Sequence, residues 1–129
     1  MLKKNITVTD YNNLPFCSAV KAGDFLFLSG HAGVKDENGN RYTTVEGQTR
    51  QALENVKRTL GAVGATLNDV VKVTVYIKDI RYYKEMNEIY RQYFRDEYPA
   101  RSTIVTGLVF SSMLLEIECV AYLPQSHSD

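Results

Sequence analysis

Hydrophobic and polar residues alternate along the middle and the end of this chain. Within residues 69–80, positions 71, 73, 75 and 77 hold valine or isoleucine, whereas Lys72, Thr74 and Lys78 lie between or beside them. Successive side chains of a strand point to opposite faces of a sheet, so this pattern predicts a half-buried strand. Residues 113–123 alternate in the same way, and residues 102–108 are predicted to form a further strand.

Two other segments carry apolar residues at helical spacing. Thr43 followed by Glu46 is a capping-box pattern, and it opens a helix whose apolar positions recur to residue 63, before Gly64. A second helix is predicted over residues 81–95, because Pro99 pushes the residue before it out of the helical basin. The predicted buried stripe of this second helix is Tyr83, Met86, Tyr90, Tyr93 and Phe94.

The first part of the chain predicts a hairpin. Residues 18–20 and 25–29 flank Gly23, which can take the positive φ of a tight turn, and a second turn is predicted at residues 36–40. The element order is then strand, strand, helix, strand, helix, strand, strand. This order predicts a single α+β domain over residues 1–129, a mixed sheet with both helices on one face.

The face of the sheet away from the helices has an unusual composition in its last strand. Glu116 and Glu118 share that face with a leucine, a valine and a tyrosine. Two carboxylates in so apolar a setting do not suit a plain solvent face. We therefore expect this face to form an interface between subunits.

Composition narrows the classes of function. Fifteen basic and fifteen acidic side chains balance in 129 residues, so no overall field favours nucleic acid or an anionic membrane. No apolar run approaches the ~20 residues needed to cross a bilayer. The two cysteines and two histidines do not stand at metal-ligand spacings, so no metal site is predicted. We expect a cytoplasmic protein with reduced thiols.

The candidate chemistry lies in the last two predicted strands. If these strands pair as a hairpin around residues 109–112, one register places Arg101 and Thr103 on the same face as Glu116 and Glu118. Arginine holds a carboxylate through two parallel hydrogen bonds, and a neighbouring glutamate can activate water. The alternative is an Arg–Glu ion pair that merely satisfies a buried interface, since such pairs mimic active sites.

Residues 99–103, Pro-Ala-Arg-Ser-Thr, and residues 115–121, Leu-Glu-Ile-Glu-Cys-Val-Ala, resemble the C-terminal signature of the Rid/YjgF family of reactive-intermediate deaminases. Residues 27–30, 48–60, 64–67, 70–78 and 86–94 extend the resemblance over nearly the whole chain. The resemblance implies a chorismate-mutase-like fold, a homotrimer with sites at the subunit boundaries, and neither metal nor organic cofactor.

The resemblance also implies a reaction: the hydrolysis of enamines and imines such as 2-aminoacrylate to 2-oxo acids and ammonia. Arg101 matches the arginine that binds the substrate carboxylate, and Glu116 matches the glutamate beside the attacking water. Thr103 matches a position that contributes backbone hydrogen bonds. The positions that match residues lining the cleft are Ser29, Gly30 and Asn87.

Two positions depart from the family pattern. Phe16 stands where deaminating members usually have a tyrosine, so a substrate-contacting hydroxyl is missing there, and His31 stands where glutamine is common. His31 is interpreted as a loop histidine or as a proton shuttle, and Cys17 as a small packed residue or as a reactive thiol. Two other functions stay open: a non-catalytic trimer that binds small carboxylates, and an endoribonuclease or translation inhibitor, which the zero net charge disfavours.

Overall fold

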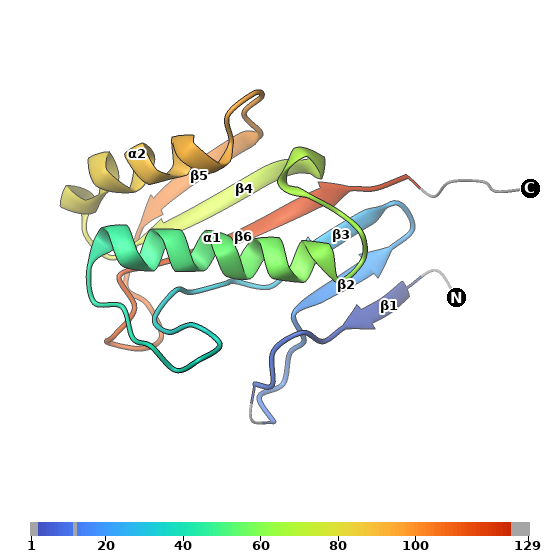
Figure 1. The fold of residues 1–129 in the computed structure, drawn as a ribbon, viewed down its shortest axis with the longest axis horizontal. Coiled ribbons are helices and arrows are strands. Elements are labelled where there is room, and N and C mark those ends of the chain that lie inside the picture. Colours follow the sequence, from blue (N-terminus) through green and yellow to red (C-terminus); the bar gives the residue numbers. More distant parts are fainter. Residues whose placement is uncertain (1–2, 12, 125–129) are drawn as a thin grey trace, which may run out of the picture.

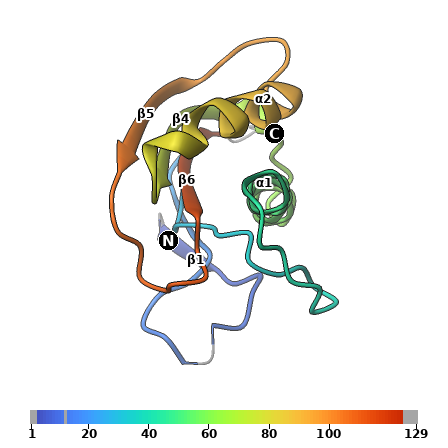
Figure 2. The same cartoon turned by 90° about the vertical axis from the view of Figure 1, so that its left-hand side faces the viewer.

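The protein, described here by a computed structural model for residues 3–11 and 13–124, folds into one mixed sheet covered by two helices. The strands are β1 (Lys3–Ile6), β2 (Ala19–Ala22), β3 (Phe25–Leu28), β4 (Val70–Ile77), β5 (Ala100–Val105) and β6 (Leu115–Tyr122), in the spatial order β1-β2-β3-β6-β4-β5. The helices are α1 (Val45–Gly61) and α2 (Tyr83–Tyr93), and short 3₁₀ turns span Leu67–Asp69 and Ile80–Tyr82. Figures 1 and 2 show both helices on the same side of the sheet, which confirms the predicted α+β architecture.

The core lies between the helices and the sheet. Alternate residues of β6, from Leu115 to Ala121, are at most 4% exposed, as the alternation predicts, and the apolar stripe of α1 packs over them. Strand β4 buries Val73, Val75 and Ile77, but Val71 is 44% exposed. A β-bulge between residues 70 and 72 shifts the register there, so the predicted alternation fails at its first position.

The predicted turns are present. Gly23 joins β2 to β3 with a φ of 59°, and Gly39 has a φ of 84° in the turn that Asp36 caps by accepting backbone hydrogen bonds from residues 38 and 40. The cap of α1 is Thr44, whose hydroxyl accepts from the amide of Gly47, so the predicted cap at Thr43 is wrong by one residue.

The predicted hairpin between the last two strands is wrong. Strand β6 lies between β3 and β4, so both of its edges are occupied, and β5 instead pairs parallel with the far edge of β4. In this register Val73 lies beside both Arg101 and Cys119, whereas Glu116 lies beside Tyr76. Ladder partners share a face, so Arg101 projects to the helix side and Glu116 to the open side of the sheet.

Candidate active site

Arg101 lies on the edge strand β5, against helix α2. Its guanidinium carbon is 4.7 Å from the ring centroid of Tyr90 and 5.8 Å from that of Tyr83, and Nη2 donates a long hydrogen bond of 3.5 Å to the Tyr83 hydroxyl. A guanidinium over an aromatic face is attracted by the ring quadrupole. The two tyrosines therefore orient Arg101 while its remaining donors stay available to a ligand.

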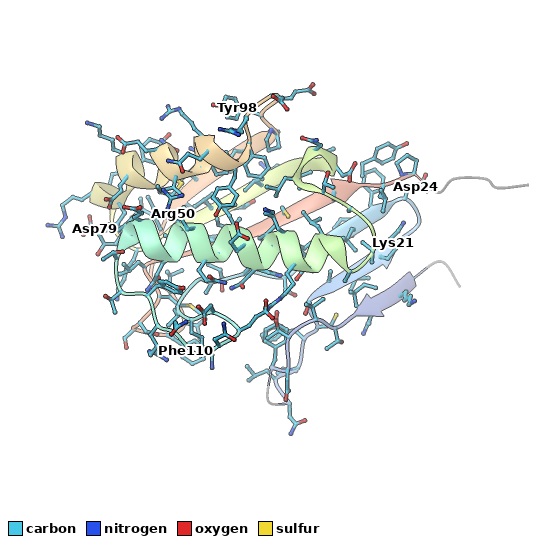
Figure 3. All side chains as sticks on the ribbon, viewed as in Figure 1. Lys21, Asp24, Arg50, Asp79, Tyr98 and Phe110 are labelled. Atoms are coloured by element: carbon cyan, nitrogen blue, oxygen red, sulfur yellow. The ribbon has the colours of Figure 1, made fainter. Side chains whose placement is uncertain are left out.

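A surface pocket of about 230 Å³ opens beside this arginine. Asn87, from α2, lines it, so the structure brings this predicted cleft residue together with Arg101. Tyr98, on the loop between α2 and β5, forms another wall and is 59% exposed (Figure 3). Thr103 follows two residues after Arg101 on β5 and shares its face. The complete lining is Tyr83, Asn87, Tyr90, Arg91, Tyr98, Pro99 and Arg101.

Glu116 and Gly30 form a second group on the open face. A Cβ atom on Gly30 would lie 2.6 Å from both Cδ and Oε1 of Glu116, so the carboxylate packs directly on the glycine backbone. The adjacent Ser29 donates its hydroxyl proton to the carbonyl of Cys17 at 2.7 Å, and its amide to the carbonyl of Ser18. These bonds position the segment after β3 that carries Gly30 beside the glutamate.

The electrostatic setting of Glu116 suits a base. Partial burial, and then the negative charge of Glu118, raise the pKa of Glu116 above its ordinary value. Glu118 in turn accepts a hydrogen bond from the hydroxyl of Tyr76. A carboxylate with a raised pKa takes up a proton from water more readily than an ordinary surface carboxylate.

His31 is buried rather than exposed in a loop. One ring nitrogen, Nδ1, lies 2.6 Å from the carbonyl of Ser29, and Nε2 lies 2.8 Å from the hydroxyl of Thr59 on α1. This arrangement fits a neutral ring that donates to the carbonyl and accepts from the hydroxyl. Burial lowers the pKa of His31. Both ring nitrogens are engaged, so the histidine holds the Ser29–Gly30 segment to α1 and has no free nitrogen for proton transfer.

The remaining candidates differ in their surroundings. Phe16 is 49% exposed on the loop before β2, and its ring packs on Tyr11 at a centroid distance of 4.6 Å. Cys17 is half-buried, with its thiol 3.3 Å from the carbonyl of Ala19. Cys119 is buried, and burial raises the pKa of its thiol to about 12, which makes it unreactive.

The predicted site residues thus fall into two groups within one chain. Arg101 and Asn87 share the pocket on the helix side, and Glu116 and Gly30 are in contact on the open side. Sequence reasoning missed the pocket walls made by Tyr83 and Tyr98 and the second arginine, Arg91. Tyr83 was assigned to the buried stripe of its helix, yet it is 41% exposed and lines the open pocket beside Arg101.

Within residues 3–11 and 13–124, no group of three or more histidine, cysteine, aspartate or glutamate side chains converges as a metal site. In the same part of the chain, neither helix has the length and apolar composition that a membrane span requires.

Comparison with known proteins places this chain in a family. The sequence model of the family described as endoribonuclease L-PSP matches residues 10–123. A RutC family protein of Pyrococcus horikoshii is 43% identical over 109 residues, which cover 84% of this chain and 86% of that protein. The chloroplastic reactive intermediate deaminase A of Arabidopsis thaliana is 41% identical over 110 residues, which cover 84% of this chain and 59% of that protein.

Solved structures agree with the sequence comparisons. A Rid family protein from Yersinia pestis superimposes with a TM-score of 0.85 at 30% identity, covering 94% of this chain and 99% of that one. The fold of this chain is that of the Rid family protein on which it superimposes. The chain belongs to the endoribonuclease L-PSP family, also known as the Rid/YjgF family.

Proposed function

We propose that this protein hydrolyses reactive enamines and imines of small 2-amino acids to 2-oxo acids and ammonia. The observation that carries the proposal is Arg101, which two tyrosines orient and which opens into a pocket shared with Asn87. The name of the A. thaliana relative, a reactive intermediate deaminase, supports the same class of reaction.

Arg101 is the group that binds the substrate carboxylate. A guanidinium fork matches a carboxylate with two parallel N–H···O bonds, which fixes the orientation as well as the position of the bound acid. Asn87 borders the same pocket and offers an amide for the imine nitrogen or a carboxylate oxygen. The bound substrate then presents its C=N carbon at the mouth of the pocket.

Glu116 is the group that positions water. The enamine first tautomerises to the imine; water then adds to the C=N carbon while Glu116 accepts a proton from it. The resulting carbinolamine takes a proton on nitrogen and expels ammonia, which leaves the 2-oxo acid. Alignment of one water with a clamped substrate removes much of the entropy cost of this addition. The reaction needs no nucleophile from the protein.

The two groups of residues lie on opposite faces of the sheet, so we infer that a complete site forms between copies of the chain. Arg101 of one copy would meet Glu116 of the next, and a closed ring of three copies would hold three such sites. The open face supports this assembly, since it presents Phe25, Phe27 and Tyr122 at 41–47% exposure around half-buried carboxylates.

A coupled assay tests the proposed function. A serine dehydratase generates 2-aminoacrylate, whose decay is followed by absorbance with wild-type protein, with Arg101→Ala, and without protein. We expect faster decay with the wild type and the protein-free rate with Arg101→Ala. Equal decay in all three samples would refute the proposed enzymatic function. The chain has no excess of basic side chains to attract the phosphates of an RNA backbone, so ribonuclease activity is not proposed.

The compartment remains a proposal as well. We propose a cytoplasmic location, which fits two free cysteines, although the A. thaliana relative is named as chloroplastic. Fractionation of the native cells, with detection of the protein by antibody, tests this location.

A further inference from the structure

The pocket beside Arg101 contains a second positive charge. Arg91, two turns along α2 from Tyr83, lines the same pocket, and no carboxylate is among the lining residues. Within the described part of the chain, the ion pairs join other residues, and neither Arg91 nor Arg101 takes part in one. One small pocket is thus lined by two arginines, neither of which forms an ion pair within the described residues.

The charges of both arginines reach the same pocket wall. The hydrogen bond with Asn87, and then the positive charges of Arg101 and Arg91, lower the pKa of the Tyr83 hydroxyl. Tyr90, which also lines the pocket, holds Arg101 through its ring. Arg91 is exposed on α2, and its long side chain can reach a molecule bound in the pocket that it lines.

We propose that this pocket prefers substrates with two carboxylates, the imines of acidic amino acids such as 2-iminosuccinate and 2-iminoglutarate. This inference rests on the proposed function, because it names the substrate class of the same site. The carboxylate next to the imine carbon binds Arg101, and the distal carboxylate binds Arg91. The reaction is otherwise unchanged: the imine and one water give the 2-oxo diacid and ammonia.

A monocarboxylate such as 2-iminobutanoate would satisfy Arg101 alone. Its alkyl end would lie beside Arg91 and gain nothing from that charge. An exposed charge pair contributes modestly, which corresponds to a preference for the diacid of about threefold to fivefold in affinity at low salt. Salt weakens the preference, since the second pair is screened by solvent.

The test compares stable product analogues by isothermal titration calorimetry. Wild-type protein is titrated with 2-oxoglutarate and with 2-oxobutyrate, and so are Arg91→Gln and a matched control, Lys84→Gln, which removes an exposed charge from the same helix outside the pocket. We expect the wild type and Lys84→Gln to bind the diacid about threefold to fivefold more tightly. Arg91→Gln should bind both acids equally, with its affinity for 2-oxobutyrate unchanged.

Turnover measurements separate this inference from the proposed function. Wild-type protein is assayed with 2-iminobutanoate and with 2-iminosuccinate, the latter made in place by an L-aspartate oxidase. Hydrolysis of the monoacid imine without any diacid preference would overturn the inference and leave the proposed function standing. A diacid preference in binding with no acceleration of either imine would overturn the proposed function and keep the selectivity. A diacid preference that survives in Arg91→Gln would also overturn the inference, because another group would then hold the second carboxylate.

Discussion

Substitution of Gly30 by alanine tests whether the close packing of Glu116 on the backbone matters for activity. The new Cβ would lie 2.6 Å from Cδ and Oε1 of Glu116 and 3.0 Å from its Cγ, whereas ordinary contacts begin at 3.4 Å. The atoms in the way are the far end of a side chain, which can rotate away at small cost in stability. The carboxylate must then leave its position by a distance of roughly 1 Å, and a misplacement of that size can cost on the order of 10²-fold in rate.

Gly33 provides the contrasting control, three residues further along the chain. A Cβ there would lie 2.1 Å from the backbone oxygen of Gln48 and 2.5 Å from the backbone nitrogen of Ala52. These atoms belong to helix α1 and cannot move without displacing the helix. Overpacking of this kind costs about 1–3 kcal/mol of folding free energy, which corresponds to a fall in Tm of roughly 3–12 °C for a chain of this size.

Two measurements on the same preparations distinguish the variants. Thermal unfolding followed by circular dichroism should show Gly30→Ala near the wild type and Gly33→Ala clearly lower. The dehydratase-coupled assay, run well below both transitions, should show Gly30→Ala reduced by about two orders of magnitude. Wild-type activity in Gly30→Ala would refute the role of Glu116 that we propose. An equal loss of stability in both variants would refute the reasoning from the contact geometry.

Three further predictions concern Arg101, Tyr90 and His31. Arg101→Lys keeps the positive charge but loses the two parallel hydrogen bonds that a guanidinium can donate to a carboxylate. We therefore expect KM for 2-aminoacrylate to rise about tenfold in steady-state assays, with a smaller change in kcat. Among the described residues the buried hydroxyl of Tyr90 makes no hydrogen bond of good geometry and interacts weakly with the Arg101 guanidinium, so Tyr90→Phe should unfold in urea with equal stability or a gain of about 1 kcal/mol. Burial holds the pKa of His31 in the folded state below the ordinary value of 6.5 that it has in the unfolded state. At pH values between these two, the folded state therefore binds fewer protons than the unfolded state. The contribution of His31 to the free energy of unfolding should therefore be fully present above pH 6.5 and be lost as the pH falls through the lowered pKa of the folded state. His31→Gln should remove this pH dependence of the free energy of unfolding, measured by urea titrations across pH 4.5–7.5.

The elements of this fold were predictable wherever one face of a segment is buried. The alternation in residues 115–122 and the helical spacing in residues 45–61 each reflect burial against the same core, and Gly23 marks its turn by a conformation that other residues avoid. Strand β1 was not predicted, because Lys3, Lys4 and Asn5 are exposed and show no apolar periodicity.

The sequence predicted where strands occur better than it predicted which strands pair. Residues 100–105 read as a strand, but their pattern does not say which strand they join. The parallel partner, β4, lies before a whole helix in the chain, so a hairpin with β6 was the simpler assumption. That assumption placed Arg101 and Glu116 on one face, and the actual register separates them.

The side-chain contacts around Arg101 and His31 could not be predicted either, because they depend on how the elements pack. The cation–π contact between Arg101 and Tyr90 joins residues from different elements, and so does the hydrogen bond between His31 and Thr59. No local pattern encodes either contact. The residue types drew attention to Arg101 and Glu116, but their proposed roles came from the resemblance to the Rid/YjgF family, because an arginine and a glutamate near one another fit a structural ion pair equally well.

The proposed reaction requires a site completed by two copies of the chain, with Arg101 from one copy and Glu116 from its neighbour. Co-expression of Arg101→Ala and Glu116→Gln tests this directly, with each variant carrying a different affinity tag so that mixed assemblies can be purified and counted. Each variant alone should be inactive. In a ring of three, every mixed assembly contains one interface with both an intact Arg101 and an intact Glu116, so a random equal mixture should recover about a quarter of wild-type activity. Mixed assemblies as inactive as either parent would contradict the account, because the two residues would then have to come from the same chain or play no part in the reaction.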